Sequence, residues 1–343
     1  MKLITADVHS DVSTVGRFAG PKNNLYMQQE LSIPTTIEHF KNVILNTGNN
    51  VIVVIEEGSM SGWLKRNLET YTKRFVVSEP KHNDLIAKNP NKDESEDIQG
   101  LADLFVMGKI KEVYHTDSLK RQKFKDLVLY YADIASQVSS AKSKLKAHYL
   151  YCGRHMKGAR IYNPENRQEN IQMISSQTDP VIIENLFDLL ERKVQIKKSL
   201  DKRIAKKGRE YPVISRFRDI PGVGNITAAT FFAIVDTPWR FKTVKKLWKY
   251  NGLAVGRQTS NGRWLSREGL LPEGNRLLKN RMITAAKNAV RTTSDNPFKR
   301  LLRRKISQEK TRAAAVNTVA RKLVSVMWGM WKTDSYYDPA KVG

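Results

Sequence analysis

The 343-residue sequence has one cysteine, Cys152, and no long apolar run. A single thiol can form no disulfide within the chain and cannot build a cysteine-based zinc site. No stretch approaches the ~20 apolar residues that a transmembrane helix needs. The N-terminus also lacks the basic-then-apolar pattern of a secretory signal. These absences favour a soluble protein of the reducing cytoplasm, with no membrane partner.

The sequence also has few acidic residues relative to basic ones. The chain has 59 Lys and Arg against 34 Asp and Glu, which gives a formal net charge of +25. A charge this large favours a polyanionic partner, because self-repulsion makes it costly as a device for solubility alone. Residues 1–116 hold 13 basic and 15 acidic side chains, a net of −2, whereas residues 117–343 hold 46 and 19, a net of +27. This division favours a near-neutral catalytic part joined to a basic part that holds nucleic acid.

The first hundred residues alternate between β-forming runs and helical patterns. The predicted strands cover residues 3–6, 13–18, 25–33, 51–55 and 74–77. Helices are expected between Thr36 and Thr47, over 63–72 and over 97–107. Three antiparallel-type strands, a helix and then a β-α-β unit are the order of an RNase H-like (RuvC-like) fold. The expected fold class is therefore α/β plus α, with this domain over residues 1–116.

Acidic side chains stand at the ends of two predicted strands. Asp7 follows the first strand and Glu56 follows the buried strand, while Glu94 and Asp97 stand three residues apart at a helix start. Phosphodiester cleavage commonly uses two cations about 3.5–4 Å apart, and magnesium prefers oxygen ligands. These four acids are therefore predicted to be catalytic ligands of two Mg²⁺ ions. Taken singly, each also fits a solvated charge or an acid favoured by the helix dipole.

The pattern changes to long helices after residue 116. Apolar residues recur at gaps of three and four from Phe124 to His148, and a second helical pattern covers 179–207. The polar stretch 153–178 between them is read as a loop. A regular seam of this kind is typical of a coiled coil. Such helices either pack on their own domain as a hairpin or join two subunits, and the regular seam favours a dimerisation arm over residues 117–207.

A third, mainly helical domain is expected over residues 208–343. Ile220-Pro221-Gly222-Val223-Gly224 matches the hairpin of a helix-hairpin-helix motif. Its glycines, Gly222 and Gly224, allow backbone N–H groups to approach a phosphate at the next helix N-terminus. A plain turn between helices has the same composition. The charge of the surrounding region favours contact with nucleic acid.

Ser260 stands in a glycine-rich basic segment between Arg257 and Arg263. From composition alone it is best explained as a turn residue. Arginines around a hydroxyl would also neutralise the charge that develops during phosphoryl transfer to serine. Trp248, Trp264 and Phe298 offer stacking surfaces. Further basic residues are predicted to contact phosphates along helices, namely Arg276, Lys279, Arg303 and Arg304.

These motifs together resemble those of one family of mobile-element proteins. The N-terminal part contains Ile4-Thr5-Ala6-Asp7-Val8-His9-Ser10-Asp11, Ile55-Glu56-Glu57-Gly58-Ser59-Met60-Ser61-Gly62 and Lys92-Asp93-Glu94-Ser95-Glu96-Asp97-Ile98. The C-terminal part contains Ile220-Pro221-Gly222-Val223-Gly224, Tyr250-Asn251-Gly252-Leu253-Ala254, Ser260-Asn261-Gly262 and Gly274-Asn275-Arg276. In order and spacing, nearly the whole chain resembles the transposases of the insertion sequence one-ten family and the related pilin-gene invertases.

The resemblance implies a DNA recombinase with a composite active site. Asp7, Glu56, Glu94 and Asp97 would be the ligands of a RuvC-like Asp-Glu-Asp-Asp site, and Ser260 would take a DNA phosphate covalently. The family also implies a guide (bridge) RNA, and homodimers that assemble as tetramers on target and donor DNA. Subunits would then share the active site. The expected location is a prokaryotic cytoplasm, in association with the nucleoid.

The sequence departs from the family pattern at the third acid. Alignment on Asp97 puts Glu94 where the family has aspartate, and Asp93 is adjacent. Glu57 is likewise a neighbour of Glu56. Two other functions use the same features. A RuvC-like nuclease that cleaves DNA with water needs the acids but not Ser260, and a non-catalytic nucleic-acid-binding protein needs only the basic surface.

Overall fold

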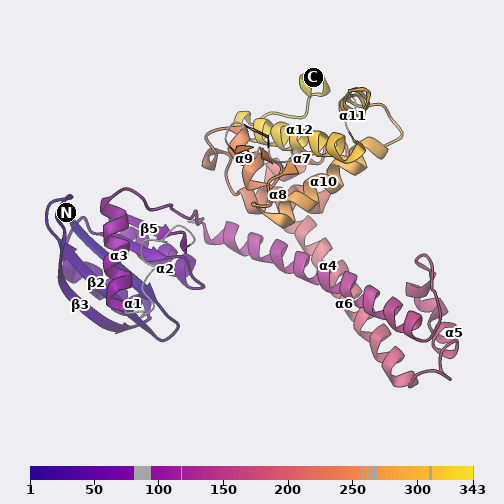
Figure 1. The fold of residues 1–343 in the computed structure, drawn as a ribbon, viewed down its shortest axis with the longest axis horizontal. Helices are drawn as coiled ribbons and strands as arrows, with labels where there is room; N and C mark the ends of the chain where they lie inside the picture. Colours follow the sequence, from indigo (N-terminus) through magenta and orange to yellow (C-terminus); the bar gives the residue numbers. More distant parts are fainter. Residues whose placement is uncertain are drawn as a thin grey trace. The chain divides into compact units, whose positions relative to one another are not determined.

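The computed structural model describes residues 1–80, 94–116, 118–256, 269–308 and 311–342, and the backbone of 259–260 and 263–264. Internal contacts divide the chain into two compact units, Met1–Lys120 and Arg121–Gly343 (Figure 1). Within the described residues, no helix is both long and apolar enough to cross a bilayer.

The first unit is built on a mixed five-stranded sheet. Its strands are β1 (Lys2–Val8), β2 (Val12–Ala19), β3 (Tyr26–Pro34), β4 (Ile52–Glu56) and β5 (Arg74–Ser78). They lie in the order β3-β2-β1-β4-β5. The β1–β2 and β2–β3 pairs are antiparallel, whereas the β1–β4 and β4–β5 pairs are parallel. All five predicted strands are confirmed, because their alternating or continuous apolar patterns are local signals.

Helices cover both faces of this sheet (Figure 1). One face carries α1 (Ile37–Thr47), α2 (Ser61–Leu68) and the short helix η1 (Glu69–Tyr71), and its core includes Ile4, Ala6 and Val53. The other face carries α3 (Glu94–Val106), whose core includes Leu3 and Val54. Successive strand residues alternate between the two faces. On β1, every second side chain after Leu3 therefore points toward α3. The same holds on β4 for every second side chain after Val54.

Two long helices of the second unit lie side by side as a hairpin (Figure 1). They are α4 (Leu119–Tyr151) and α6 (Pro180–Gly208). Val138 and Leu145 of α4 share an apolar core with Ile183 and Leu190 of α6. The Lys193 ammonium donates to the Gln137 side-chain oxygen at 2.5 Å. The helices were expected, and the seam that was assigned to dimerisation is filled by a helix of the same chain.

The connection between the long helices differs from the predicted loop. It contains η3 (Arg160–Tyr162), η4 (Pro164–Asn166) and α5 (Arg167–Gln172). Ile161, Ile171 and Ile174 are buried against the ends of α4 and α6. The prediction of a loop over residues 153–178 was wrong, because a few widely spaced isoleucines anchor a segment that is otherwise polar.

The rest of the second unit is mainly helical, as predicted. Its helices are α7 (Pro212–Phe217), α8 (Asn225–Val235), η5 (Pro238–Arg240), α9 (Val244–Tyr250), α10 (Arg276–Arg291), α11 (Pro297–Ser307), α12 (Arg312–Thr333) and η6 (Pro339–Val342). Helix α8 is apolar on nearly all sides and buried from Thr227 to Val235, which is typical of a central helix. Phe124 of α4 and Ile204 of α6 belong to the same core. The long hairpin is therefore rooted in this helical domain.

Candidate active site

Asp7 and Glu56 stand at the ends of neighbouring parallel strands. The last pair of the β1–β4 ladder is Ala6 with Ile55, and the two acids are the next residue on each strand. Both acids fall on the α3 face, because side chains alternate along a strand. The sheet therefore brings two of the four predicted acids to the same edge and the same face.

Helix α3 brings Glu94 to this edge. Thr14, the cross-strand partner of Asp7 on β2, donates its hydroxyl to the Glu94 carboxylate. Ser95 donates to the carboxylate of Glu30 at 2.7 Å, and Thr5 donates to a main-chain carbonyl of α3, also at 2.7 Å. The N-terminal part of α3 is thus attached to β1, β2 and β3. Its acids are also favoured by the helix dipole.

His9 completes a cluster that sequence reasoning missed. Its Nε2 atom lies 3.1 Å from Asp7 Oδ2 and 3.7 Å from Glu94 Oε1. One ligand atom from each of the three residues lies within 4.8 Å of the others. The available signal was the spacing, since His9 follows Asp7 by two residues, just beyond the end of β1 at Val8. The predicted site contained only carboxylates, because magnesium was the expected ion.

The chemistry of this cluster fits a divalent cation. Ligand atoms at about 2.1 Å from magnesium are about 3 Å apart when adjacent and about 4 Å apart when opposite. The distances of 3.1 and 3.7 Å from His9 Nε2 to the Asp7 and Glu94 carboxylates lie in this range. An imidazole beside carboxylates also suits manganese, because imidazole is a better ligand for transition metals than for magnesium.

The remaining predicted acids lie outside this cluster of three. Glu56 and Asp97 are half-buried, and Asp97 shares a face of α3 with Glu94 by its spacing of three residues. Asp93 lies outside the described residues. Glu57 is engaged elsewhere: it accepts a hydrogen bond from Ser61 at 2.9 Å, and its carboxylate lies 2.8 Å from His115 Nε2.

Ser260 lies in a small β structure of the second unit. The outer ladder pairs β6 (Val255–Gly256) with β9 (Gly269–Leu270), and the inner one pairs β7 (Thr259–Ser260) with β8 (Arg263–Trp264). Both ladders are antiparallel, and the backbone of Ser260 pairs with that of Arg263. Ser260 is therefore the last residue of β7. Arg257 lies outside the described residues.

The segments flanking this β structure meet at its base. The backbone N–H of Asn275 donates to the Tyr250 carbonyl at 2.7 Å. The Asn275 side chain accepts from Leu278 N–H at 2.9 Å and caps α10. The Tyr-Asn-Gly and Gly-Asn-Arg motifs of the sequence are therefore neighbours in space, and together they hold both ends of the segment that contains Ser260.

Gly222 and Gly224 have different environments. Gly222 has φ +84°, and a Cβ there would lie 2.3 Å from the Ala285 carbonyl oxygen of α10. This glycine therefore allows the hairpin to pack against α10. Gly224 is exposed and is the N-cap of α8, which has no side-chain cap. Uncapped N–H groups at a helix start are suited to phosphate binding.

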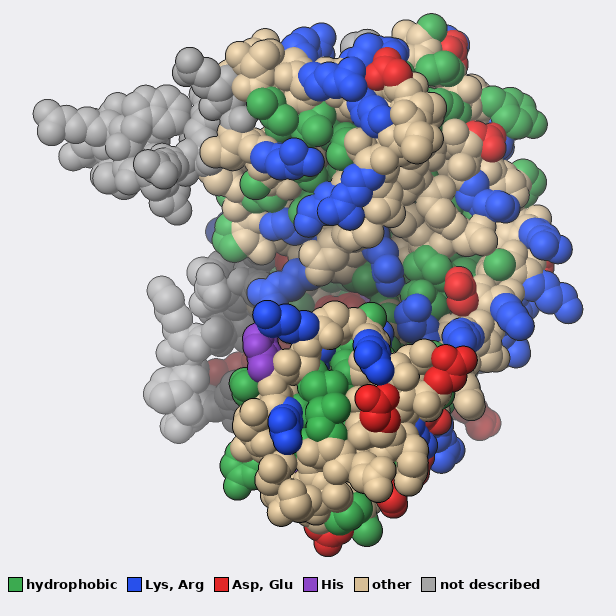
Figure 2. Space-filling view, turned by 90° about the vertical axis from the view of Figure 1, so that its right-hand side faces the viewer, with side chains coloured by type: hydrophobic (Ala, Val, Ile, Leu, Met, Phe, Trp, Pro, Cys, Tyr) green, Lys and Arg blue, Asp and Glu red, His purple; other side chains and the backbone are tan. Residues whose placement is uncertain are grey.

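The predicted phosphate-contacting residues on helices differ in their partners. Arg276 is exposed at the first position of α10, and Lys279 follows one turn later. Arg303 lies 3.5 Å from Asp295, which also binds Arg300. Arg304 is exposed and has no ion-pair partner in the described part of the chain. Lys and Arg side chains are widely spread over the face in Figure 2, with fewer Asp and Glu between them.

A comparison with protein families identifies the region that holds Ser260. Residues 214–302 match the model described as the transposase IS116/IS110/IS902 family. This segment of the second unit is similar to the transposases of that family. The match confirms the resemblance seen in the motifs, and it covers the hairpin at Gly222, the strand of Ser260 and the start of α10. The comparison with curated proteins gave no match.

The aromatic residues of the transposase domain differ from their predicted roles. Phe298 is fully buried, and the Trp248 indole donates to the Arg321 carbonyl and to Ser325, each at 3.2 Å. The prediction that Phe298 offers a stacking surface was wrong, because this ring packs inside the domain. Trp248 is half-buried, and its stacking role stays a prediction. The side chain of Trp264 lies outside the description. Trp239, which sequence analysis did not select, is 70% exposed.

Proposed function

We propose that this transposase is a DNA recombinase that cuts and rejoins strands with Ser260 and a metal-binding acidic site, guided by a bound RNA. One observation carries the catalytic part of the proposal. Asp7 and Glu94 are brought together in the first unit, beside the end of the strand that bears Glu56. A segment of the second unit of the same chain is similar to transposases.

The fold of the first unit supports this proposal. The order β3-β2-β1-β4-β5, with three antiparallel strands followed by two parallel ones, is the order that an RNase H-like, RuvC-like domain requires. Asp7 and Glu56 lie at the carboxyl ends of the parallel strands β1 and β4. Ligands in open α/β sheets commonly bind at this edge. We assign residues 1–116 to this catalytic domain.

Asp7, Glu56, Glu94 and Asp97 would hold two Mg²⁺ ions, with His9 as a further ligand. When bound, the ions would supply charge stabilisation at the oxygens of the scissile phosphate. The protein's own residues position that site. The β1–β4 ladder aligns Asp7 with Glu56, and Thr14 holds the carboxylate of Glu94. His9 lies against both Asp7 and Glu94 and orients them.

Ser260 would act as the nucleophile. Its oxygen forms a bond to phosphorus while the bond from phosphorus to one sugar oxygen breaks, and the serine proton ends on the released sugar hydroxyl. The bond energy is kept in the phosphoserine ester, so the reverse step rejoins strands without a further energy source. Arg257 and Arg263 would neutralise the charge that develops at the phosphate.

Nucleic acid would be held over the second unit. The start of α8 at Gly224 and the side chains of Arg276, Lys279, Arg303 and Arg304 would contact phosphates of DNA and guide RNA. Gly222 would keep the hairpin in place against α10. We assign this role to residues 208–343, which include the serine.

The arm over residues 117–207 would join subunits through its outer surfaces. Its inner seam is filled within the chain, so association needs other apolar side chains. Tyr130 is 51% exposed and Tyr151 is 84% exposed on α4. Exposed aromatic residues of this kind are enriched at protein interfaces. Homodimers formed in this way would assemble as tetramers on target and donor DNA.

Ser260→Ala tests the serine mechanism against the water-using nuclease. Labelled DNA carrying the element ends is incubated with the protein, its co-purified RNA and Mg²⁺, and covalent adducts are resolved on a denaturing gel. We expect the variant to lose the adduct and strand transfer, while Thr259→Ala, its neighbour on β7, keeps both. Cleavage that survives Ser260→Ala without an adduct would favour the nuclease.

Asp7→Asn tests the metal site against a purely binding function. The variant should lose cleavage at every Mg²⁺ concentration while still binding DNA. Activity that needs no metal would contradict the acidic site. Sequencing the RNA that co-purifies with the protein tests the guide, and the lack of a discrete RNA species would remove that part of the proposal.

A further inference from the structure

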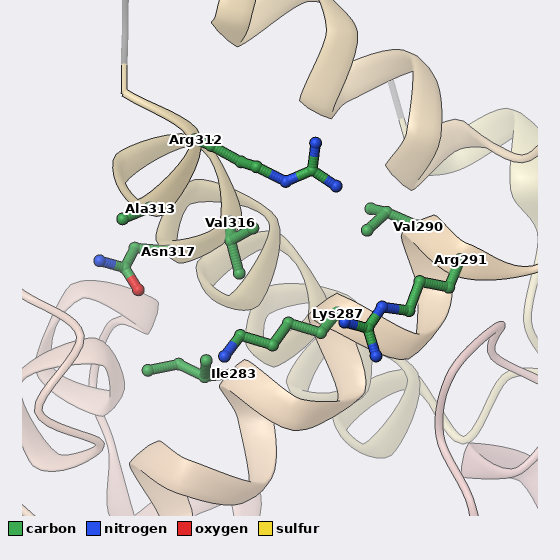
Figure 3. A pocket seen from close by; sticks show the side chains of 8 residues that line it. All are labelled: Ile283, Lys287, Val290, Arg291, Arg312, Ala313, Val316 and Asn317. Atoms are coloured by element: carbon green, nitrogen blue, oxygen red, sulfur yellow. The ribbon is translucent and has the colours of Figure 1, made fainter. Parts of the chain in front are cut away.

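A pocket of about 350 Å³ lies between α10 and α12 (Figure 3). Its walls combine two kinds of side chain. Ile283 and Val290 of α10 and Val316 of α12 supply apolar surface, and Lys287, Arg291 and Arg312 supply positive charge. The volume is at the small end of ligand pockets, which are about 300–1,000 Å³. The pocket therefore suits a group of nucleotide size rather than a helix or an extended peptide.

The three cations have no neutralising partner among the residues that the structure describes. Lys287, Arg291 and Arg312 are exposed, and none forms a hydrogen bond or an ion pair within the described part of the chain. The sequences of α10 and α12 contain no Asp or Glu. By contrast, Arg300 and Arg303 on the neighbouring α11 share Asp295. Three unpaired positive charges around one pocket favour an anionic ligand.

The apolar surface of the pocket favours an anionic ligand that also carries an apolar group. Val316 is buried, and Ile283 and Val290 are half-buried. The phosphates of a duplex backbone would engage the cations but would leave this concave apolar surface uncovered. An unpaired nucleotide brings a flat base together with its phosphates. The base can cover the apolar wall while its phosphates reach the cations at the rim of the pocket.

We propose that this pocket binds a single unpaired nucleotide of a nucleic-acid strand. The base lies over Ile283, Val290 and Val316, and the adjoining phosphates contact Lys287, Arg291 and Arg312. This inference rests on the proposed function only in taking nucleic acid as the partner. The unpaired nucleotide has two sources, a single-stranded region of RNA and an unwound DNA strand, and both present the same chemistry.

Binding of short single strands tests the proposal directly. The full-length protein is titrated into labelled DNA and RNA oligonucleotides of about ten nucleotides, a usual site size for single-strand binders. A matched set carries abasic positions, which keep the phosphates and remove the bases. We expect the abasic strands to bind roughly tenfold more weakly, because contact with a base contributes this much in other single-strand sites. Whichever of the RNA and DNA oligonucleotides binds more tightly identifies the source of the unpaired nucleotide.

Two variants separate the pocket from general charge. Ala313→Trp fills the pocket from its exposed wall and leaves the charge unchanged, so it should abolish the preference for ordinary over abasic strands. Arg304→Ala removes an unpaired cation outside the pocket. It should weaken both strands equally, reduce the salt slope by about one and keep the preference.

Arg312→Gln provides a second pocket variant if Ala313→Trp unfolds. It should reduce both the preference and the salt slope, and thermal unfolding curves establish that it is folded. Equal affinity of the native protein for ordinary and abasic strands would overturn the proposal that the pocket binds a nucleotide. A preference for ordinary strands that survives in Ala313→Trp would also overturn it. In those cases nucleic acid remains the partner. Failure to bind any strand or duplex would overturn the nucleic-acid part of the proposed function as well.

Discussion

The backbone of Gly274 lies directly against that of Gly252. A Cβ at position 274 would be 2.5 Å from the Gly252 nitrogen, and both glycines have positive φ, +112° and +62°. The two segments that flank the strands of Ser260 therefore meet backbone to backbone. This contact restrains both ends of the serine-bearing segment.

Gly274→Ala should destabilise the protein and impair DNA strand transfer. The new methyl group would clash with Gly252, and positive φ is strained for alanine, so we expect a loss of about 2–4 kcal/mol in the free energy of unfolding. Gly158→Ala is the matched control, because Gly158 has φ +72° but open space around its Cβ position. Chemical denaturation measures both. Equal losses in the two variants would mean that backbone strain, rather than the close approach, explains the effect.

Thr14→Val should weaken metal binding without unfolding the first unit. The substitution keeps the shape of a buried side chain and removes the hydroxyl that holds Glu94. Loss of such a supporting hydrogen bond lowers metal affinity by roughly 10- to 100-fold. The Mg²⁺ or Mn²⁺ dependence of DNA cleavage measures the change. Ser95→Ala breaks the neighbouring contact to Glu30 and should leave the metal dependence unaltered, and a shift of equal size there would contradict the role of Thr14.

His9→Ala should affect manganese more than magnesium. The imidazole lies against both Asp7 and Glu94, and imidazole contributes more to the binding of transition metals. We expect about a tenfold rise in the Mn²⁺ concentration needed for half-maximal cleavage, and a smaller rise for Mg²⁺. His39→Ala, on α1, is the control. Equal shifts for both metals would argue that His9 only orients the carboxylates.

Tyr149→Phe should change the stability of the hairpin at alkaline pH. The Tyr149 ring is fully buried, and its hydroxyl has no partner in the described part of the chain. Burial, with a smaller contribution from Cys152, raises the pKa of Tyr149 to about 12. The unfolded chain ionises at its ordinary pKa of 10.0, so the native protein holds more protons between these values. Its stability therefore falls as the pH rises through this window.

The Tyr149→Phe variant has no hydroxyl at this position to ionise. At neutral pH it should be more stable by about 1 kcal/mol, because an unpaired buried hydroxyl is removed. Its advantage over the native protein should grow from pH 10 to 12. Thermal unfolding across this range measures the difference, with Tyr151→Phe as an exposed control. A constant difference would show that Tyr149 does not contribute to alkaline unfolding.

Local patterns predicted the sheet, the helices and the positions of the acids at strand ends. The proximity of Glu94 to Asp7 depends on Thr14, which lies 80 residues earlier in the chain than Glu94, and no local pattern carries that contact. His9 was missed because only oxygen ligands were considered. The heptad pattern identified the buried face of α4, but such a pattern does not specify whether the facing helix belongs to the same chain.

Tertiary packing also determines the role of residues whose type is compatible with two different roles. Gly222 and Gly224 are alike in sequence, yet one packs against α10 and the other is exposed at the start of α8. Trp248 and Phe298 were read as stacking surfaces because they lie among basic residues. Phe298 fills the domain interior, and Trp248 is half-buried against α12. Composition alone does not distinguish such positions from a surface role.

The long hairpin also sets a distance. Helix α4 has 33 residues, which corresponds to about 50 Å, and its base shares a core with α8. If two copies join at the tips of their arms, the length of these helices sets the distance between their transposase domains. Adding one heptad to both helices would lengthen each arm by about 10 Å. The spacing of DNA sites that such a pair can engage would then change in discrete steps.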